Sequence, residues 1–236
     1  KAREGDIRNF NISVALTDGF MEKVVNNEPS PWMCEWRGME MKPRRIIRDE
    51  YGTVLDIKEE TMTAREIMEE IIGAAWNNGE PGVIFIDNVN KANPLPQLGP
   101  IEACNPCGEQ YLHDGDVCNL GSLNLDKFVK EGQVDWEKLK YVARHAVRML
   151  DNVIDINFYP TIEARNSNMR HRPVGLGIMG FQDAVFRLDM SFDSEVAVKF
   201  SERIMEVISY NAILASSELA KERGAYETYE GSKWSR

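Results

Sequence analysis

Short apolar segments alternate with longer amphipathic ones along this chain, and that alternation constrains the fold more than any other feature. Residues 9–16 alternate polar and apolar side chains, which is the two-residue period of a half-buried strand. Residues 82–87 form a short apolar run that is typical of a strand buried on both faces. Helical patterns lie between and after these runs, so the sequence predicts an α/β architecture.

Two helices are predicted in the first part of the chain. Residues 18–26 fit a short helix. A longer one is predicted after Thr63, because Thr63 and Glu66 fit a capping box and apolar residues follow at helical spacing. Gly79 predicts its end. Residues 29–56 have no clear period, and we expect loops and a small hairpin there. We also expect a loop at residues 88–99.

Two long helices are predicted in the second part. Ser194 fits the N-cap of a helix that reaches about Arg223, with Gly224 as its stop. The other begins at Asp135 or Trp136 and carries one apolar stripe. The stripe consists of Leu139, Val142, Ala143, Ala146, Val147, Leu150, Val153 and Ile154. Residues 174–181 form a short, glycine-rich apolar piece between these helices.

The charge balance excludes some classes of function. Among 236 residues, 38 are Asp or Glu and 28 are Lys or Arg, a formal net charge of -10. Such an acidic chain is a poor candidate for gripping a nucleic-acid polymer by its phosphates. No apolar run is long enough for a membrane span, and no signal-peptide pattern is present. Four cysteines do not make a disulfide scaffold, so we expect a cytoplasmic protein with functional thiols.

Three of the four cysteines lie close together near the middle of the chain. Cys104 and Cys107 belong to the run Cys-Asn-Pro-Cys-Gly-Glu, and Cys118 follows eleven residues after Cys107. One interpretation is a zinc-binding interaction module, because Cys104, Cys107, His113 and Cys118 supply three thiolates and an imidazole. Zinc has no need of the neighbouring carboxylate and amide, however.

The other interpretation is redox or radical chemistry at Cys107. Pro106 and Gly108 favour a tight loop with Cys107 at its tip. If that loop is extended, Asn105, Cys107 and Glu109 share one face, because alternate side chains point the same way. Glu109 can then take a proton from a substrate hydroxyl that the Asn105 amide orients. Cys118 begins a strand-like stretch, and its thiol can reach the cavity in which that substrate would lie.

These residues resemble a known family. Asn105-Pro106-Cys107-Gly108-Glu109, with Cys118 inside Cys-Asn-Leu-Gly-Ser-Leu-Asn-Leu, is similar to the catalytic large chain of ribonucleotide reductase. The adenosylcobalamin-dependent class is the most similar. Supporting stretches cover much of the chain: residues 5–14, 82–88, 172–180 and 229–232.

The resemblance implies a fold and a mechanism. The fold is a ten-stranded α/β barrel of two halves, with a central finger loop that carries the radical cysteine. Cys107 matches that cysteine, whose thiyl radical removes the 3′ hydrogen of the ribose. Glu109 is then the base at the 3′ hydroxyl, and Asn105 hydrogen-bonds the sugar. Cys118 matches one of two thiols that reduce the substrate and end as a disulfide. Adenosylcobalamin supplies the radical, or, as the alternative, a separate metal-radical subunit does.

The resemblance also implies that the chain is the central part of the catalytic barrel domain and is inactive alone. The redox partner of Cys118 is expected upstream of Asn105, and Cys34 does not match it in context. The phosphate loop is expected beyond residue 236. Parts outside the chain are expected to receive a thioredoxin-like dithiol reductant and dNTP or ATP effectors. The substrate is a ribonucleoside diphosphate or triphosphate, and a homodimer is an arrangement that the resemblance allows.

Two further motifs have competing interpretations. Residues 175–180 spell G-x-G-x-x-G, but a poor strand precedes them, so close packing of a barrel strand explains the glycines better than a nicotinamide site. A basic cluster allows two interpretations: it is a solvated loop, or it contacts a phosphate or cofactor. It contains Arg165, Arg170, His171 and Arg172.

Overall fold

The computed structural model describes residues 10–235, which fall into two compact units. Unit 1 extends to Asn93 and includes Ile101–Glu109, whereas unit 2 consists of Pro94–Pro100 and the chain from Gln110 onward. Within the described residues the strands form five two-stranded sheets, of which two are parallel and three antiparallel. Parallel pairs joined through helices confirm the α/β class. These residues form no closed barrel, and no finger loop threading one is seen.

Unit 1 is built on one parallel strand pair and the helices around it. Strand β1 (Ser13–Leu16) pairs with β6 (Gly82–Phe85). The chain between these two strands includes helix α1 (Asp18–Val25) and helix α2 (Ala64–Asn78), both of which the sequence predicts. The capping box of α2 at Thr63 is confirmed, and Gly79 ends the helix in the left-handed conformation. The part of the first predicted strand at Asn9 lies outside the described residues.

Three sequence predictions for residues 29–99 differ in detail from the structure. Strand β6 is not buried on both faces, because only Ile84 is buried and β1 is its one partner among the described strands. The expected loop at 88–99 contains most of helix α3 (Ile86–Ala92) and a 3₁₀ turn (Pro96–Leu98). Residues 29–56 do contain the expected small hairpin, but a second hairpin begins in this region where the sequence predicts loops. The hairpins pair β2 (Cys34–Trp36) with β3 (Met39–Met41) and β4 (Arg44–Arg48) with β5 (Val54–Glu59).

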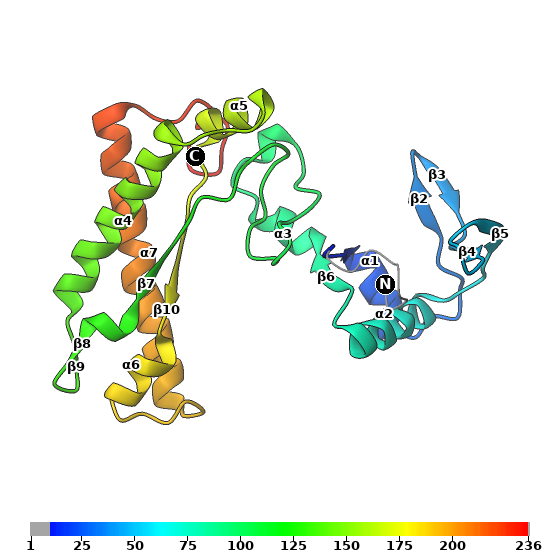
Figure 1. Ribbon diagram of the computed structural model, residues 1–236, viewed down its shortest axis with the longest axis horizontal. Helices are drawn as coiled ribbons and strands as arrows, with labels where there is room; N and C mark the ends of the chain where they lie inside the picture. Colours follow the sequence, from blue (N-terminus) through cyan, green and yellow to red (C-terminus); the bar gives the residue numbers. More distant parts are fainter. Residues whose placement is uncertain (1–9, 236) are drawn as a thin grey trace. The chain divides into compact units, whose positions relative to one another are not determined.

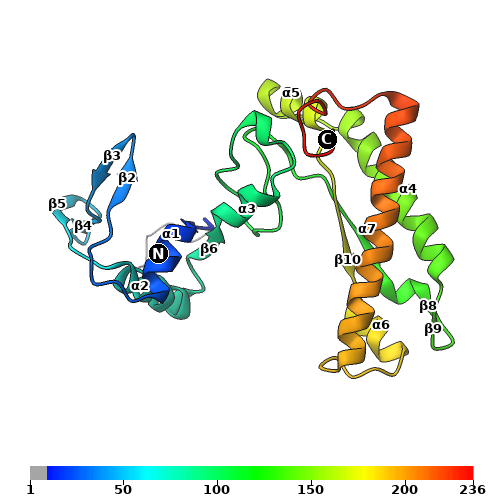
Figure 2. The ribbon, with the colours of Figure 1, turned by 180° about the vertical axis from the view of Figure 1, so that it is seen from behind.

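Unit 2 contains the two long helices that the sequence predicts. Helix α4 (Trp136–Ile156) and helix α7 (Glu195–Arg223) run side by side in both views (Figures 1 and 2). Strand β7 (Leu120–Asn124) pairs in parallel with β10 (Gly175–Met179) beside them. Asp135 and Ser194 cap the two helices with their side chains, as their positions in the sequence predict.

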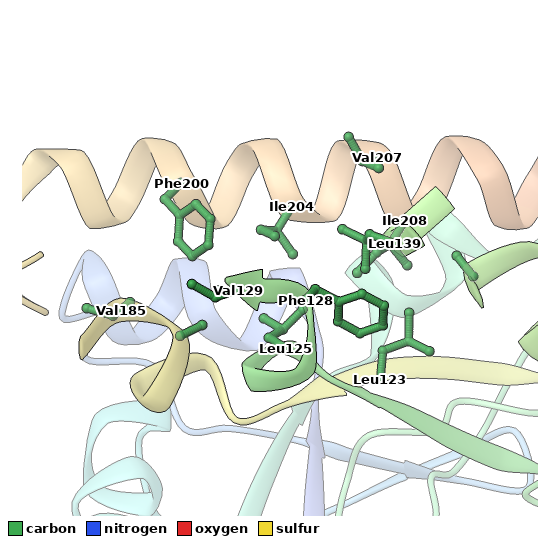
Figure 3. Close-up of a cluster of buried hydrophobic side chains, with 12 residues drawn as sticks. Leu123, Leu125, Phe128, Val129, Leu139, Val185, Phe200, Ile204, Val207 and Ile208 are labelled. Carbon is green, nitrogen blue, oxygen red and sulfur yellow. The ribbon is translucent and has the colours of Figure 1, made fainter. Parts of the chain in front are cut away.

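The core of unit 2 lies between α7 and the chain that follows β7. Leu139 of α4 is fully buried, and Ile204 of α7 is 1% exposed. Figure 3 shows Phe200 and Ile204 pointing from α7 toward the segment that carries Leu125 and Val129. The first half of the predicted apolar stripe of α4 packs into this core, whereas Val147 further along packs with Ala215 and Leu219 of α7. Val153, near the end of the stripe, is 37% exposed.

Shorter elements complete unit 2. They are a 3₁₀ turn (Leu125–Phe128), the hairpin β8 (Val129–Lys130) with β9 (Gln133–Val134), helix α5 (Ile162–His171) and helix α6 (Phe181–Arg187). Of the glycines in the G-x-G-x-x-G motif, Gly175 fits close strand packing, because a Cβ there would meet the side chains of Gln110 and, 2.6 Å away, of Leu120 on the paired strand. Gly177 has only ordinary contacts. Across the described part of the chain, none of the helices has the length and apolar character required to span a membrane.

The basic cluster around residue 170 is not a solvated loop. Arg165, Arg170 and His171 belong to α5, and Arg172 is its C-cap. The cations are paired with carboxylates: Arg170 with Glu227, and Arg172 with both Asp151 and Asp155. Arg172 Nε lies 2.8 Å from Asp151 Oδ1 and its Nη1 lies 2.8 Å from Asp155 Oδ1, so this side chain joins the end of α5 to α4.

This ion pair predicts a dependence of stability on pH. Hydrogen bonding to Arg172 lowers the pKa of the Asp155 carboxyl below its usual value. Because folding lowers this pKa, the ionised Asp155 carboxylate stabilises the fold at pH values above the ordinary aspartate pKa of about 4. This contribution is lost as the pH falls through the lowered pKa. Arg172→Gln should therefore lower the free energy of unfolding at neutral pH by on the order of 1 kcal/mol. The difference from wild type should shrink below about pH 4.

Chemical denaturation followed by circular dichroism at several pH values measures this difference. Arg165→Gln is the matched control, since Arg165 is an exposed arginine on the same helix. A loss that is the same at pH 3 and pH 7 would contradict the assignment to Asp155.

Candidate functional site

Cys107 lies at the tip of a tight turn in unit 1. The backbone N–H of Gly108 donates to the carbonyl of Asn105 over 3.0 Å, which closes a four-residue turn. Gly108 has a φ of +80°, a conformation that favours glycine. The tight loop predicted from Pro106 and Gly108 is thus confirmed. We call residues 105–108 the Cys107 turn.

The side chains of the Cys107 turn are accessible to different degrees. Cys107 and Glu109 are exposed, while Asn105 is half-buried. The condition under which all three would share one face of an extended strand is not met. The reason is local: Pro106 and Gly108 bend the backbone between Asn105 and Glu109, so simple alternation does not apply.

Two asparagines that the sequence analysis did not single out anchor this region. Asn11 Nδ2 donates to the carbonyl of Pro106 over 3.0 Å, across 95 residues of sequence. Asn90 on α3 accepts from the backbone N–H of Ile101 and donates to its carbonyl, over 2.8 and 2.9 Å. A side-chain amide has both a donor and an acceptor and so can hold another backbone as a strand would. No local pattern in the sequence marks either residue.

Cys118 lies in unit 2, two residues before β7, and its side chain is exposed. The residues on both sides of it are held by side-chain hydrogen bonds. The backbone N–H of Val117 donates to Asn168 Oδ1 over 3.3 Å, and Asn119 Nδ2 donates to the carbonyl of Leu150 over 2.7 Å. The backbone at Cys118 is therefore fixed while its thiol remains accessible.

The zinc alternative receives no support. Among the residues described, no group of three or more His, Cys, Asp or Glu side chains is arranged to hold a metal ion. Cys104 and Cys107 belong to unit 1, whereas His113 and Cys118 belong to unit 2. The pKa of His113 is lowered by burial of its ring and, more weakly, by His171, against an opposing effect of Asp116.

Comparison with known proteins identifies the family. The family model described as ribonucleotide reductase, barrel domain, matches residues 1–236, so the chain belongs to that family. A vitamin B12-dependent ribonucleoside-diphosphate reductase of Mycobacterium tuberculosis is 38% identical over 98% of this chain and 31% of its own length.

Relatives with other names match as well. The ribonucleoside-diphosphate reductase subunit alpha of Chlamydia pneumoniae is 45% identical over 73% of this chain and 17% of its own length. The large subunit of the variola virus ribonucleoside-diphosphate reductase is 37% identical over 95% of this chain and 30% of its own length. The chain thus spans at most 31% of the length of these three relatives.

Proposed function

We propose that this chain is the central part of a ribonucleotide reductase catalytic chain, and that the whole enzyme converts ribonucleotides to 2′-deoxyribonucleotides. The observation that carries the proposal is an exposed Cys107 at the tip of a hydrogen-bonded turn, in a chain that matches the reductase barrel family over its whole length. A thiyl radical needs a fixed backbone and an open side to meet one C–H bond of a substrate. The Cys107 turn provides a fixed backbone and an accessible thiol.

The proposed roles follow from the chemistry of each group. The Cys107 thiyl radical takes the 3′ hydrogen atom of the ribose and becomes a thiol. Glu109 accepts the proton of the 3′ hydroxyl, and Asn105 hydrogen-bonds the sugar. The 2′ hydroxyl leaves as water. Two electrons come from a pair of thiols, of which Cys118 is one, and the pair ends as a disulfide. Cys107 recovers its radical when the 3′ hydrogen returns to the sugar.

The proposed cofactor is adenosylcobalamin. The Mycobacterium tuberculosis relative, whose match covers 98% of this chain, is named vitamin B12-dependent. When bound, the cofactor supplies a radical by homolysis of its cobalt–carbon bond. The exposed Cys107 thiol fits this source, because it is reachable from outside the turn. A radical from a separate subunit is the alternative, and the relatives named subunit alpha and large subunit favour it.

The names of these relatives also favour ribonucleoside diphosphates as substrates over triphosphates. Regions outside residues 1–236 would receive the thioredoxin-like dithiol and the dNTP or ATP effectors. A cytoplasmic location and a homodimer belong to the same proposal.

The direct test is product formation by the full-length enzyme. Incubation with a ribonucleoside diphosphate, a dithiol and adenosylcobalamin should yield the deoxyribonucleotide, and omission of the cobalamin should stop the reaction. Activity only with a separate metal-radical subunit would decide for the alternative radical source. Absence of product under both conditions would refute the reductase function.

Glu109→Gln tests the proposed base. Glutamine keeps the size and hydrogen-bonding capacity of the side chain but cannot accept a proton, so kcat of the full-length enzyme should fall by about 10²- to 10⁴-fold. Substrate affinity, measured by equilibrium binding, should change little. Glu102→Gln is the matched control, because Glu102 is an exposed carboxylate in the same segment. An equal effect of both substitutions would contradict the role of Glu109.

A further inference from the structure

The segment that leads to Cys118 has no helix or strand of its own. Residues 113–116 make one turn, in which the backbone N–H of Asp116 donates to the carbonyl of His113 over 3.1 Å. Gly115 has a φ of +82°, and a Cβ at this position would lie 3.5 Å from Ser167 Cβ. The turn therefore lies directly against α5. Because it forms no backbone ladder, its position depends on the side chains that hold it.

One buried carboxylate makes most of these contacts. Asp116 Oδ1 accepts a hydrogen bond from Ser167 Oγ over 2.6 Å and lies 3.0 Å from His171 Nδ1. The Asp116 side chain is 2% exposed and that of His171 is 8% exposed. Ser167 and His171 are four residues apart on α5 and so lie on the same face of the helix.

The neighbouring residues extend this anchor up to the thiol. Ser167 Oγ also lies 3.4 Å from the carbonyl oxygen of Asp114. Asn168, 1% exposed, accepts from the backbone N–H of Val117. Four consecutive residues, 114 to 117, thus lie against α5 immediately before Cys118. A buried carboxylate is strongly disfavoured unless it is hydrogen-bonded, so losing one of its partners disfavours the docked position of the whole turn.

We propose that Asp116, Ser167 and His171 form a clasp that fixes the backbone at Cys118, and that they are positioning residues for its thiol. The effect of the clasp on turnover rests on the redox role proposed for Cys118. The clasp itself does not depend on that role. The thiol must remain accessible and yet meet its partners in a defined place. A clasp that ends at Asp116, two residues before Cys118, satisfies both requirements.

The test uses the full-length enzyme and two measurements. The first measurement is the rate of amide hydrogen exchange, which reports directly on how firmly the clasp holds the backbone. In the Asp116→Ala enzyme the amides of residues 116–119 should exchange about tenfold faster. Those of β7 and α4 should change less. Turnover with a dithiol, measured well below the thermal unfolding midpoint, tests the positioning: kcat should fall by about 10²-fold with KM unchanged. A residue that only stabilised the fold would lower the unfolding midpoint without this loss of kcat in the folded enzyme.

Asp114→Ala is the matched control, because Asp114 is an exposed aspartate in the same turn and only its backbone carbonyl contacts Ser167. If Asp116→Ala does not fold, Ser167→Ala removes a single hydroxyl from the clasp and should act in the same direction. Ser167→Thr, which restores the hydroxyl, should return exchange and kcat toward wild type.

The outcomes separate the clasp from the reductase function. Unchanged exchange at residues 116–119 in both the Asp116→Ala and Ser167→Ala enzymes would overturn the clasp. Faster exchange with unchanged kcat would overturn its positioning role. If the wild-type enzyme reduces no ribonucleotide, the proposed function fails, and the exchange measurement still decides whether the clasp exists.

Discussion

Cys107→Ser should abolish ribonucleotide reduction by the full-length enzyme, with a loss in kcat of about 10⁴-fold or more. A serine O–H bond is much stronger than a cysteine S–H bond, so serine cannot carry the radical at an accessible energy. Serine is close to cysteine in size, and residue 107 is exposed, so the turn closed by Asn105 and Gly108 should form as before. Equilibrium binding of the nucleotide should therefore change little.

Cys104→Ser is the matched control for this substitution. Cys104 is half-buried and lies three residues before Cys107 in the same segment. Its replacement should leave most of the turnover. Equal losses in the two variants would favour a shared structural role of both thiols, such as metal binding, over radical chemistry at one of them. Substantial turnover in Cys107→Ser would exclude the radical role.

Helices with strong local signals are predicted from the sequence, whereas those held by tertiary contacts are missed. The capping box at Thr63, the apolar stripe of α4 and the N-cap at Ser194 are local patterns, and each helix that they predict is present. Helix α5 has no apolar stripe. Its N-cap, Thr161, is a local signal, but Asn168 and His171 also contact residues of the Cys118 segment, about 50 residues earlier, and the sequence gives no sign of these contacts.

The strands show the same limit. The apolar run at 82–87 correctly predicts β6 but not its burial, because burial depends on which strands lie beside it. The two hairpins formed by residues 34–59 are short, and β4 and β5 expose most of their side chains. Their residues therefore lack the alternation that marks a strand with one buried face.

For the candidate site, the sequence predicts the shape of the turn but not what holds it. Pro106 and Gly108 restrict the backbone locally, so the tight turn at Cys107 follows from residue types alone. The hydrogen bond from Asn11 to Pro106 joins residues 95 positions apart. An asparagine in a strand-like run gives no sign of such a partner. Likewise, nothing in the sequence distinguishes Asp116 from Asp114, since the two differ only in burial.

Cys118→Ser should block multiple turnover supported by a dithiol, with a fall in steady-state kcat of about 10³-fold. The reason differs from that for Cys107. Serine cannot form a disulfide, so the two electrons needed for each product can no longer come from the thiol pair. Removal of the 3′ hydrogen should survive in this variant, because Cys107 is intact.

Substrate labelled with tritium at the 3′ carbon distinguishes the two cysteines. Cys118→Ser enzyme should still cleave the labelled bond while forming almost no deoxyribonucleotide, whereas Cys107→Ser enzyme should do neither. Cys34→Ser is the control, since Cys34 lies on a hairpin strand of unit 1, paired with Met41, and has no proposed redox role. Wild-type steady-state turnover in Cys118→Ser would remove Cys118 from the reducing pair. The hydrogen bonds that fix Val117 and Asn119 would then need an explanation other than the placement of a reactive thiol.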